Sequence, residues 1–172
     1  MTDPAEMIYC PRCATPLVDL AHSGKLRRSC PNCRFIYFQD PKVAVIVRVI
    51  QDDKVLMVKR NMDPEKGKWA LPAGFIDYGE DPRIAARREV KEETGLDVTI
   101  TRLIDVLGPD GAPGSKTSIA ILFEAEVNGG TLMGADDVDE AVFFVQGDVP
   151  RAELAVFESL RVMIGEWLES GK

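Results

Sequence analysis

The sequence lacks the features of a membrane or exported protein. Its 172 residues contain no run close to the roughly 20 apolar residues that a membrane span needs, and residues 1–4 show neither the basic nor the apolar region of a signal peptide. Histidine occurs once, and we interpret His22 as a surface residue. These absences predict a soluble, cytoplasmic protein with no membrane partner.

Cysteine is sparse, and negative charge outweighs positive charge. No cysteine follows residue 33, and the four that are present form two close pairs, which suits one metal site better than a disulfide framework and indicates a reducing compartment. The net charge of −7 disfavours general binding to nucleic acid. The remaining composition, 45% hydrophobic and 28% charged, is that of a globular domain with a sizeable core.

The two cysteine pairs have the spacing of a zinc site. Residues 10–13 (CPRC) and 30–33 (CPNC) are separated by sixteen residues, within the range of four-thiolate zinc sites. A redox pair or two disulfides fit less well, because a short segment with little core needs a metal to fold. The segment resembles a zinc ribbon, and four thiolates would close the zinc shell, so the ion would be structural. The predicted zinc ligands are Cys10, Cys13, Cys30 and Cys33.

A group of cations accompanies the cysteines. Only Asp19 opposes them, and we interpret the group as a solubilising surface; the alternative is a surface that steers polyphosphate or RNA. The five cations are Arg12, Lys25, Arg27, Arg28 and Arg34.

A second domain is predicted to begin at Asp40-Pro41, which divides the chain into residues 1–40 and 41–172. Asp81 as N-cap, Pro82 at the first helical position and Gly95 as the stop signal predict a helix over residues 82–94. Apolar patterning predicts a hairpin, three further strands, a Gly/Pro-rich loop and an amphipathic C-terminal helix. Their ranges are 43–50 with 55–58 for the hairpin, 99–106, 119–127 and 141–145 for the strands, 108–114 for the loop and 154–168 for the helix.

Three glutamates share one face of the predicted helix. Glu89, Glu92 and Glu93 are spaced i, i+3, i+4, and this clustering is unfavourable unless a cation offsets it. A divalent cation such as Mg²⁺ prefers oxygen ligands and keeps positions open for phosphate and water. The alternative is an ordinary solvated acidic face. Flanking glycines that let the backbone approach a ligand, together with Glu80 as a brace for Arg88, favour the metal site.

Residues 74–96 carry a longer pattern that includes this face. The pattern is Gly, five residues, Glu, seven residues, then Arg-Glu-aliphatic-x-Glu-Glu-x-Gly-aliphatic. It resembles the signature of the Nudix hydrolases at every defining position. The resemblance implies an α+β fold, with a mixed β-sheet sandwiched between α-helices. It also implies hydrolysis of a pyrophosphate bond by metal-activated water, with Mg²⁺ or Mn²⁺ as cofactor.

The resemblance also assigns roles at the matching positions. It makes Glu92 and Glu93 the principal metal ligands and Glu89 a further ligand or base. Arg88 and Glu80 become an orienting pair, and the Gly74 backbone meets metal or phosphate. Many family members use a glutamate before a late strand as general base. Glu140 is the candidate here, and a solvated strand-end carboxylate is the alternative.

The rest of the chain suggests a substrate class. The cysteine segment with residues 37–42 and 69–75 resembles ribbon-bearing Nudix hydrolases active on ADP-ribose and FAD. NADH pyrophosphatases rank second, because residues 97–116 lack their Ser-Gln-Pro-Trp-type element. Arg60 and Trp69 are candidate phosphate and ring contacts, with a solvated strand end and a core aromatic as the alternatives.

Two further expectations concern the loop and the partners. A loop proline, Pro109 or Pro113, is a weaker hint of ADP-ribose hydrolysis. The competing class is a non-catalytic module that senses a nucleotide or binds RNA, and the complete carboxylate set argues against it. The resemblance also implies a homodimer.

Overall fold

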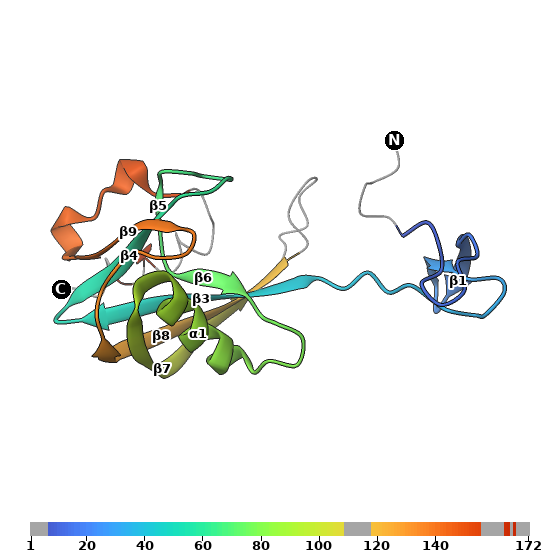
Figure 1. Cartoon of the computed structure of the whole chain (residues 1–172), viewed down its shortest axis with the longest axis horizontal. Helices are drawn as coiled ribbons and strands as arrows, with labels where there is room; N and C mark the ends of the chain where they lie inside the picture. The colour runs from blue at the N-terminus through green and yellow to red at the C-terminus, as the bar shows by residue number, and fades with distance from the viewer. Residues whose placement is uncertain (1–6, 109–117, 156–163, 166, 168–172) are drawn as a thin grey trace. The chain divides into compact units, whose positions relative to one another are not determined.

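The computed structural model describes residues 7–108, 118–155, 164, 165 and 167. The chain divides into two compact units, Met1–Asp40 (unit 1) and Pro41–Lys172 (unit 2), which are described separately (Figure 1). The predicted loop over residues 108–114 falls outside the described residues except for Gly108, so the two candidate loop prolines are not placed. No helix in the described ranges has the length and apolar character needed to cross a bilayer.

Unit 1 contains a small antiparallel hairpin. Strand β1 (Val18–His22) pairs with β2 (Lys25–Ser29). These two strands were not predicted, because the segment has no long apolar run. The structure shows the reason: nearly all of β1 is exposed, so burial imposes no two-residue period on it. The core of the unit is small and consists of Cys10, Leu17 and Cys30, against which Met7, Phe35 and Tyr37 pack.

Unit 2 is built on a seven-stranded mixed sheet. The strand order is β5-β4-β3-β8-β7, with β6 on β3 and β9 on β4. Strands β3 and β8 are parallel, whereas the other pairs are antiparallel. The strands are β3 (Lys42–Gln51), β4 (Lys54–Arg60), β5 (Trp69–Ala70), β6 (Ala73–Phe75), β7 (Leu96–Leu107), β8 (Ser118–Gly130) and β9 (Val138–Phe144).

The predicted strands of unit 2 are present, with different ends. The hairpin of β3 and β4 is confirmed, and the next two strands extend beyond their predicted ranges. The last strand begins at Val138, three residues before its predicted start, so Glu140 lies inside β9. The short strands β5 and β6 were not predicted, because two or three residues are too few to show a period.

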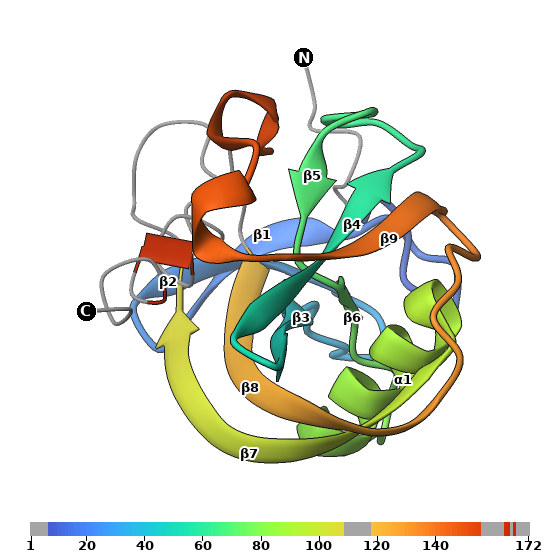
Figure 2. The ribbon, with the colours of Figure 1, turned by 90° about the vertical axis from the view of Figure 1, so that its left-hand side faces the viewer.

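The helix α1 (Pro82–Thr94) has the predicted bounds. The Asp81 side chain accepts a hydrogen bond from the Arg83 N–H, and Gly95 ends the helix with φ of 71°, a left-handed conformation that glycine adopts without strain. Its buried face, which includes Ala85, Ala86 and Val90, packs against one side of the sheet (Figure 2). The α+β fold is therefore confirmed.

A second apolar cluster covers the opposite face of the sheet. It contains Met57, Trp69 and Leu122, together with Ile164 and Trp167. Two short 3₁₀ helices, η1 (Gln146–Asp148) and η2 (Arg151–Glu153), precede the C-terminal segment. Most of the predicted C-terminal helix over residues 154–168 lies outside the described residues.

Candidate active site and cysteine cluster

Arg88 joins the turn before α1 to the helix itself. Its Nε and Nη2 donate to the two carboxylate oxygens of Glu80, each at 2.8 Å, and Nη2 also donates to the Phe75 carbonyl at 3.1 Å. Its Nη1 donates to Glu89 at 2.8 Å and to Glu92 at 3.0 Å. One guanidinium thus holds the turn and two of the three helix glutamates in register.

Glu80 is held in its charged form. The hydrogen bonds from Arg88, followed by one from the Asp77 N–H at 3.0 Å, lower the pKa of Glu80 to about 2. The predicted pairing of Glu80 with Arg88 therefore appears as a two-point contact between planar groups, the geometry that fixes orientation best.

Glu93 is buried at the base of the site. It is 4% exposed, its Oε2 accepts a hydrogen bond from the Ala73 N–H at 3.3 Å, and it forms no salt bridge within the described part of the chain. Burial, followed by the negative charges of Asp137 and Glu89, raises the pKa of Glu93 to about 9. A buried carboxylate among other carboxylates is strongly destabilised unless a proton or a cation joins it.

Glu89 lies against the backbone of Gly74. A Cβ added at Gly74 would overlap the Glu89 carboxylate. Burial is the main cause that raises the pKa of Glu89, while its hydrogen bond with Arg88 lowers it. The register of β6 on β3 pairs Gly74 with Val45, which packs on the helix side of the sheet. The first glycine of the pattern therefore provides space for a carboxylate.

The three helix glutamates are neighbours, but their oxygens are not gathered around one point. Among the described residues, one group of three or more Cys, His, Asp or Glu side chains has all its ligand atoms within 4.8 Å of one another, and this group is the four cysteines. The helix glutamates do not form such a group. Arg88 holds Glu92, whose side chain is 46% exposed. A cation bound between Glu89 and Glu93 would have to draw Glu92 away from Arg88. The oxygen chemistry and the buried Glu93 fit a hard divalent cation.

A fourth carboxylate acts on this group. Asp137 raises the pKa of both Glu89 and Glu93 through its charge. Its loop is anchored at both ends: the Ala135 N–H donates to the Glu93 carbonyl at 3.1 Å, and the Asn61 N–H donates to the Asp137 carbonyl at 3.0 Å. Asp137 was not predicted as a site residue; it lies in an acidic run, residues 136–140, that also contains Glu140.

Glu140, the predicted general base, points away from the helix glutamates. It pairs with Lys59 in the register of β9 on β4, and Lys59 Nζ contacts its Oε1 at 2.8 Å. Lys59 also lies 5.6 Å from the centre of the Trp69 ring, on the sheet face opposite α1. Side chains alternate between the two faces of a strand, and Glu140 shares the face of Lys59. Because this face is opposite the helix glutamates, Glu140 does not fit the role of base.

The two candidate substrate contacts differ. Arg60, at the end of β4, lowers the pKa of Glu93 through its charge, so its guanidinium acts on the helix site. Its Nε donates to the Pro64 carbonyl at 3.0 Å. Trp69 is 6% exposed and meets Phe144 edge to face at 5.0 Å, so it belongs to the core, which was the alternative interpretation.

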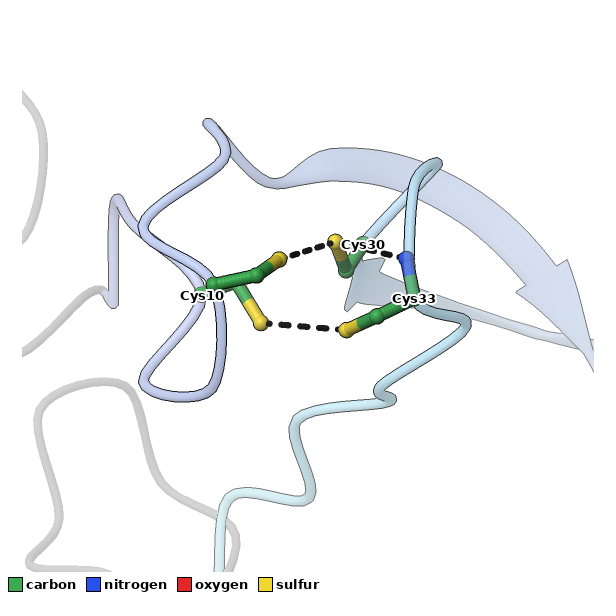
Figure 3. Close-up of side chains that lie close together, drawn as sticks. Cys10, Cys30 and Cys33 are labelled. Atoms are coloured by element: carbon green, nitrogen blue, oxygen red, sulfur yellow. Dashed lines mark hydrogen bonds between the residues drawn. The ribbon is translucent and has the colours of Figure 1, made fainter.

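The four cysteines of unit 1 converge. The Sγ atoms of Cys10 and Cys33 are 3.5 Å apart, as are those of Cys13 and Cys30. Figure 3 shows the side chains of Cys10, Cys30 and Cys33 directed toward one another from two separate turns. All four ligand atoms lie within 4.8 Å of one another. Such a cluster of sulfurs could hold one tetrahedral metal ion.

The acidities of the thiols are unequal. A hydrogen bond with the Thr15 side chain is the main cause that lowers the pKa of Cys13 to about 6. A backbone hydrogen bond involving Phe35 lowers the pKa of Cys33, but burial and the neighbouring thiols outweigh it and raise that pKa to about 12. Deprotonation of all four thiols at once is unfavourable, and a bound cation would offset the repulsion between the thiolates.

The sequence also matches a known family. The model of the NUDIX domain matches residues 40–162, well over half of the chain. The chain belongs to the Nudix family. It is 40% identical over 119 residues to an ADP-ribose pyrophosphatase of Methanocaldococcus jannaschii, a match that covers 69% of this chain and 70% of that protein. The Nudix resemblance of residues 74–96 is thereby confirmed.

Two further Nudix comparisons extend beyond the signature. A NAD-capped RNA hydrolase of Caenorhabditis elegans is 28% identical over 145 residues, which are 83% of this chain but only 38% of that protein. The crystal structure of a Nudix hydrolase from Nitrosomonas europaea has a TM-score of 0.87 and 28% identity, and covers 96% of this chain and 92% of that one. These similarities confirm the Nudix fold.

Proposed function

We propose that this chain is a divalent-cation-dependent pyrophosphohydrolase that cleaves a nucleoside diphosphate linked to another moiety, with ADP-ribose or FAD as substrate. The observation that carries the proposal is the buried Glu93 carboxylate, which lies beside Glu89 and near Asp137 and whose pKa burial and these two negative charges raise. Carboxylates with strongly raised pKa values cluster at functional sites, and a bound cation would offset the cost of burying this one.

Three glutamates and one stretch of backbone would hold the ion. Glu89 and Glu93 provide oxygens from the base of the site, Glu92 provides one after leaving Arg88, and Gly74 lets the chain approach. Mg²⁺ or Mn²⁺ held there would neutralise charge on the diphosphate and lower the pKa of a water molecule. Arg88 keeps the turn at Glu80 fixed to the helix, so the ligands stay in position while the substrate binds.

Asp137, in place of Glu140, is proposed as the general base. It approaches the site from a loop that is tied to Glu93 and Asn61. In the reaction, Asp137 accepts a proton from the attacking water as the water oxygen bonds to phosphorus. The bond from phosphorus to the bridging oxygen breaks, and the leaving phosphate keeps that electron pair. Arg60 stabilises the added negative charge.

A second substrate class has its own support. The alignment with the NAD-capped RNA hydrolase spans 145 residues and is longer than unit 2, so it includes part of residues 1–40. A dinucleotide or a dinucleotide cap on RNA is therefore the second candidate. The cysteine cluster is proposed as a structural zinc site in an N-terminal zinc ribbon of residues 1–40, followed by the Nudix domain of residues 41–172.

The test is a hydrolysis panel with and without Mg²⁺ or Mn²⁺. Its substrates are ADP-ribose, FAD, NADH, a NAD-capped RNA, diadenosine polyphosphates and nucleoside triphosphates. We expect turnover of ADP-ribose or FAD that requires the cation and is lost in Glu93→Gln, a variant of nearly equal size. Equal turnover by Glu93→Gln and the unmodified chain would contradict the assigned metal role, and a nucleotide that binds without turnover would identify a sensor.

A further inference from the structure

A short loop between β8 and β9 brings Asp137 to the helix glutamates (Figure 2). We call residues 133–137 the Asp137 loop. Its first half is fixed to the end of α1, because the Met133 and Ala135 N–H groups donate to the carbonyls of the last two helix residues at 3.0 and 3.1 Å. These hydrogen bonds reach only as far as Ala135, so they do not by themselves determine where Asp137 lies.

Asn61 holds the second half of the loop. It directly follows β4, and its backbone N–H donates to the Asp137 carbonyl at 3.0 Å. Its side-chain Nδ2 donates to the preceding carbonyl, that of Asp136, at 3.1 Å. One residue therefore binds two consecutive peptide groups of the Asp137 loop, and a substitution can remove the side-chain half of this contact.

The backbone of Asp136 explains why the side-chain contact matters. Asp136 has a φ of 55°, a left-handed conformation that residues other than glycine rarely adopt. The pairing of β9 with β4 is also irregular at this point, between Lys59 and Arg60. A carbonyl that accepts a hydrogen bond is held in one orientation, so the Asn61 amide stabilises the turn directly before Asp137.

The same contact joins two charges that act on Glu93. Burial is the main cause of the raised pKa of Glu93; the charge of Asp137 adds to it, and the charge of Arg60, the residue before Asn61, opposes it. The proposed base and the proposed charge-stabilising arginine therefore lie on the two segments that Asn61 links. Glu93 itself is fixed separately, by its place on α1 and by the Ala73 N–H.

We infer that Asn61 is a positioning residue, whose side-chain amide holds the Asp137 loop so that the Asp137 carboxylate stays beside the helix glutamates. The inference rests on the proposed function, in which Asp137 is the general base. Because the amide binds the loop and the proposed metal ligands lie on α1, its loss affects proton transfer more than substrate binding.

The first test separates the chemical step from binding. Asn61→Ala removes the amide and lowers kcat for ADP-ribose with Mg²⁺ by about 10- to 100-fold, since a reacting group misplaced by about 1 Å costs on the order of 10²-fold in rate. The KM changes much less. Circular dichroism confirms that the variant is folded, and Asn61→Leu, which also lacks a donor, takes its place if Asn61→Ala does not fold.

A double-mutant cycle with Asp137→Asn excludes a merely structural role. In the Asp137→Asn background, Asn61→Ala leaves kcat unchanged, because a base that is absent cannot be misplaced. If Asn61 only supported the fold, its substitution would lower kcat by the same factor in both backgrounds. The matched control is Asn128→Ala, which removes an amide hydrogen bond of 2.7 Å to Thr99 between β8 and β7 and leaves kcat unchanged.

Hydrogen exchange follows the Asp137 loop without turnover. The Ala135 and Val138 N–H groups donate to the Glu93 and Ala135 carbonyls at 3.1 Å each. Asn61→Ala raises their exchange rates by about 2- to 10-fold, the effect of one hydrogen bond on a local opening. Asn128→Ala leaves them unchanged.

The outcomes distinguish this inference from the proposed function. If the unmodified chain hydrolyses nothing, the proposed function fails, and exchange at Ala135 and Val138 still shows whether Asn61 holds the loop. If Asp137→Asn is slow but Asn61→Ala keeps full kcat, the proposed function stands and the positioning role is overturned. Unchanged exchange in Asn61→Ala overturns it as well.

Discussion

The carboxylate of Glu89 occupies the space in which a side chain at residue 74 would lie, so Gly74 and Glu89 form one steric unit. The two residues are far apart in sequence and come from different elements, β6 and α1. The glycine of the Nudix signature therefore has a spatial reason here: even one methyl group would displace a proposed metal ligand.

Gly74→Ala is expected to reduce activity sharply. The added methyl group forces the Glu89 carboxylate to move, and a misplacement of about 1 Å at a reacting site can cost on the order of a hundredfold in rate. Steady-state kinetics with ADP-ribose and Mg²⁺ would measure the loss. The control is Gly147→Ala, where an added Cβ meets no atom within 4 Å and activity stays the same. Full activity of Gly74→Ala would show that Glu89 does not need its present position.

The stability of the metal-free protein is expected to fall as the pH rises from about 4.5 to about 9. The folded-state pKa of Glu93 lies above its unfolded value, so the folded chain binds more protons in this window. The Glu93 contribution to the slope is at most about 1.4 kcal/mol per pH unit. Denaturant unfolding at several pH values measures this slope.

Glu93→Gln should remove that part of the slope, because its amide does not titrate. The control is Glu92→Gln, which removes a carboxylate that is 46% exposed and should leave the Glu93 slope in place. Saturating Mg²⁺ should also flatten the slope, since the cation replaces the proton. An unchanged slope in Glu93→Gln would mean that Glu93 is charged in the metal-free fold.

Asp137 and Glu140 can be distinguished by a matched pair of amide variants. Asp137→Asn is expected to lower kcat by about 10²- to 10⁴-fold, the usual contribution of general base catalysis. Glu140→Gln is expected to leave kcat nearly unchanged, because Glu140 contacts Lys59 on the other face of the sheet. The reverse ranking of the two variants would restore Glu140 as the base.

Removal of zinc is expected to unfold unit 1 selectively. The core of that unit contains two of the four cysteines, and little else supports the hairpin of β1 and β2. A strong chelator should therefore abolish the dispersed amide signals of residues 7–40 in NMR spectra while those of α1 persist. Cys30→Ser should reproduce this loss without chelator. Retention of the hairpin signals in both samples would mean that unit 1 folds without a metal.

The sequence predicted the parts of the site that depend on local structure. The caps at Asp81 and Gly95 set the ends of α1, and the spacing of its glutamates then follows from helical geometry. The pairing of Glu80 with Arg88 was expected from the position of Glu80 just before the helix, and the family pattern then assigned the two as an orienting pair. The positions that depend on strand register were harder to predict, because a shift of one residue reverses the face of every side chain.

Glu140 and Asp137 show this limit. The pairing of β9 with β4 is irregular between Lys59 and Arg60, and nothing local in the sequence indicates where that irregularity falls. The predicted strand start at residue 141 left Glu140 in a loop, whereas the strand begins at Val138. The acidic run of residues 136–140 indicated that a carboxylate near the last strand could act at the site. Which of its carboxylates lies near Glu93 depends on the pairing of β9 with β4, and that pairing favours Asp137.

The parallel pairing of β3 with β8 has a consequence for how the protein folds. Residues 42–50 must find residues 118–126, and the whole signature segment lies between them. Closure of so long a loop is slow compared with the winding of a capped helix. During synthesis, α1 leaves the ribosome long before β8 does. A nascent chain therefore carries the glutamates of the signature before the sheet that positions them has formed.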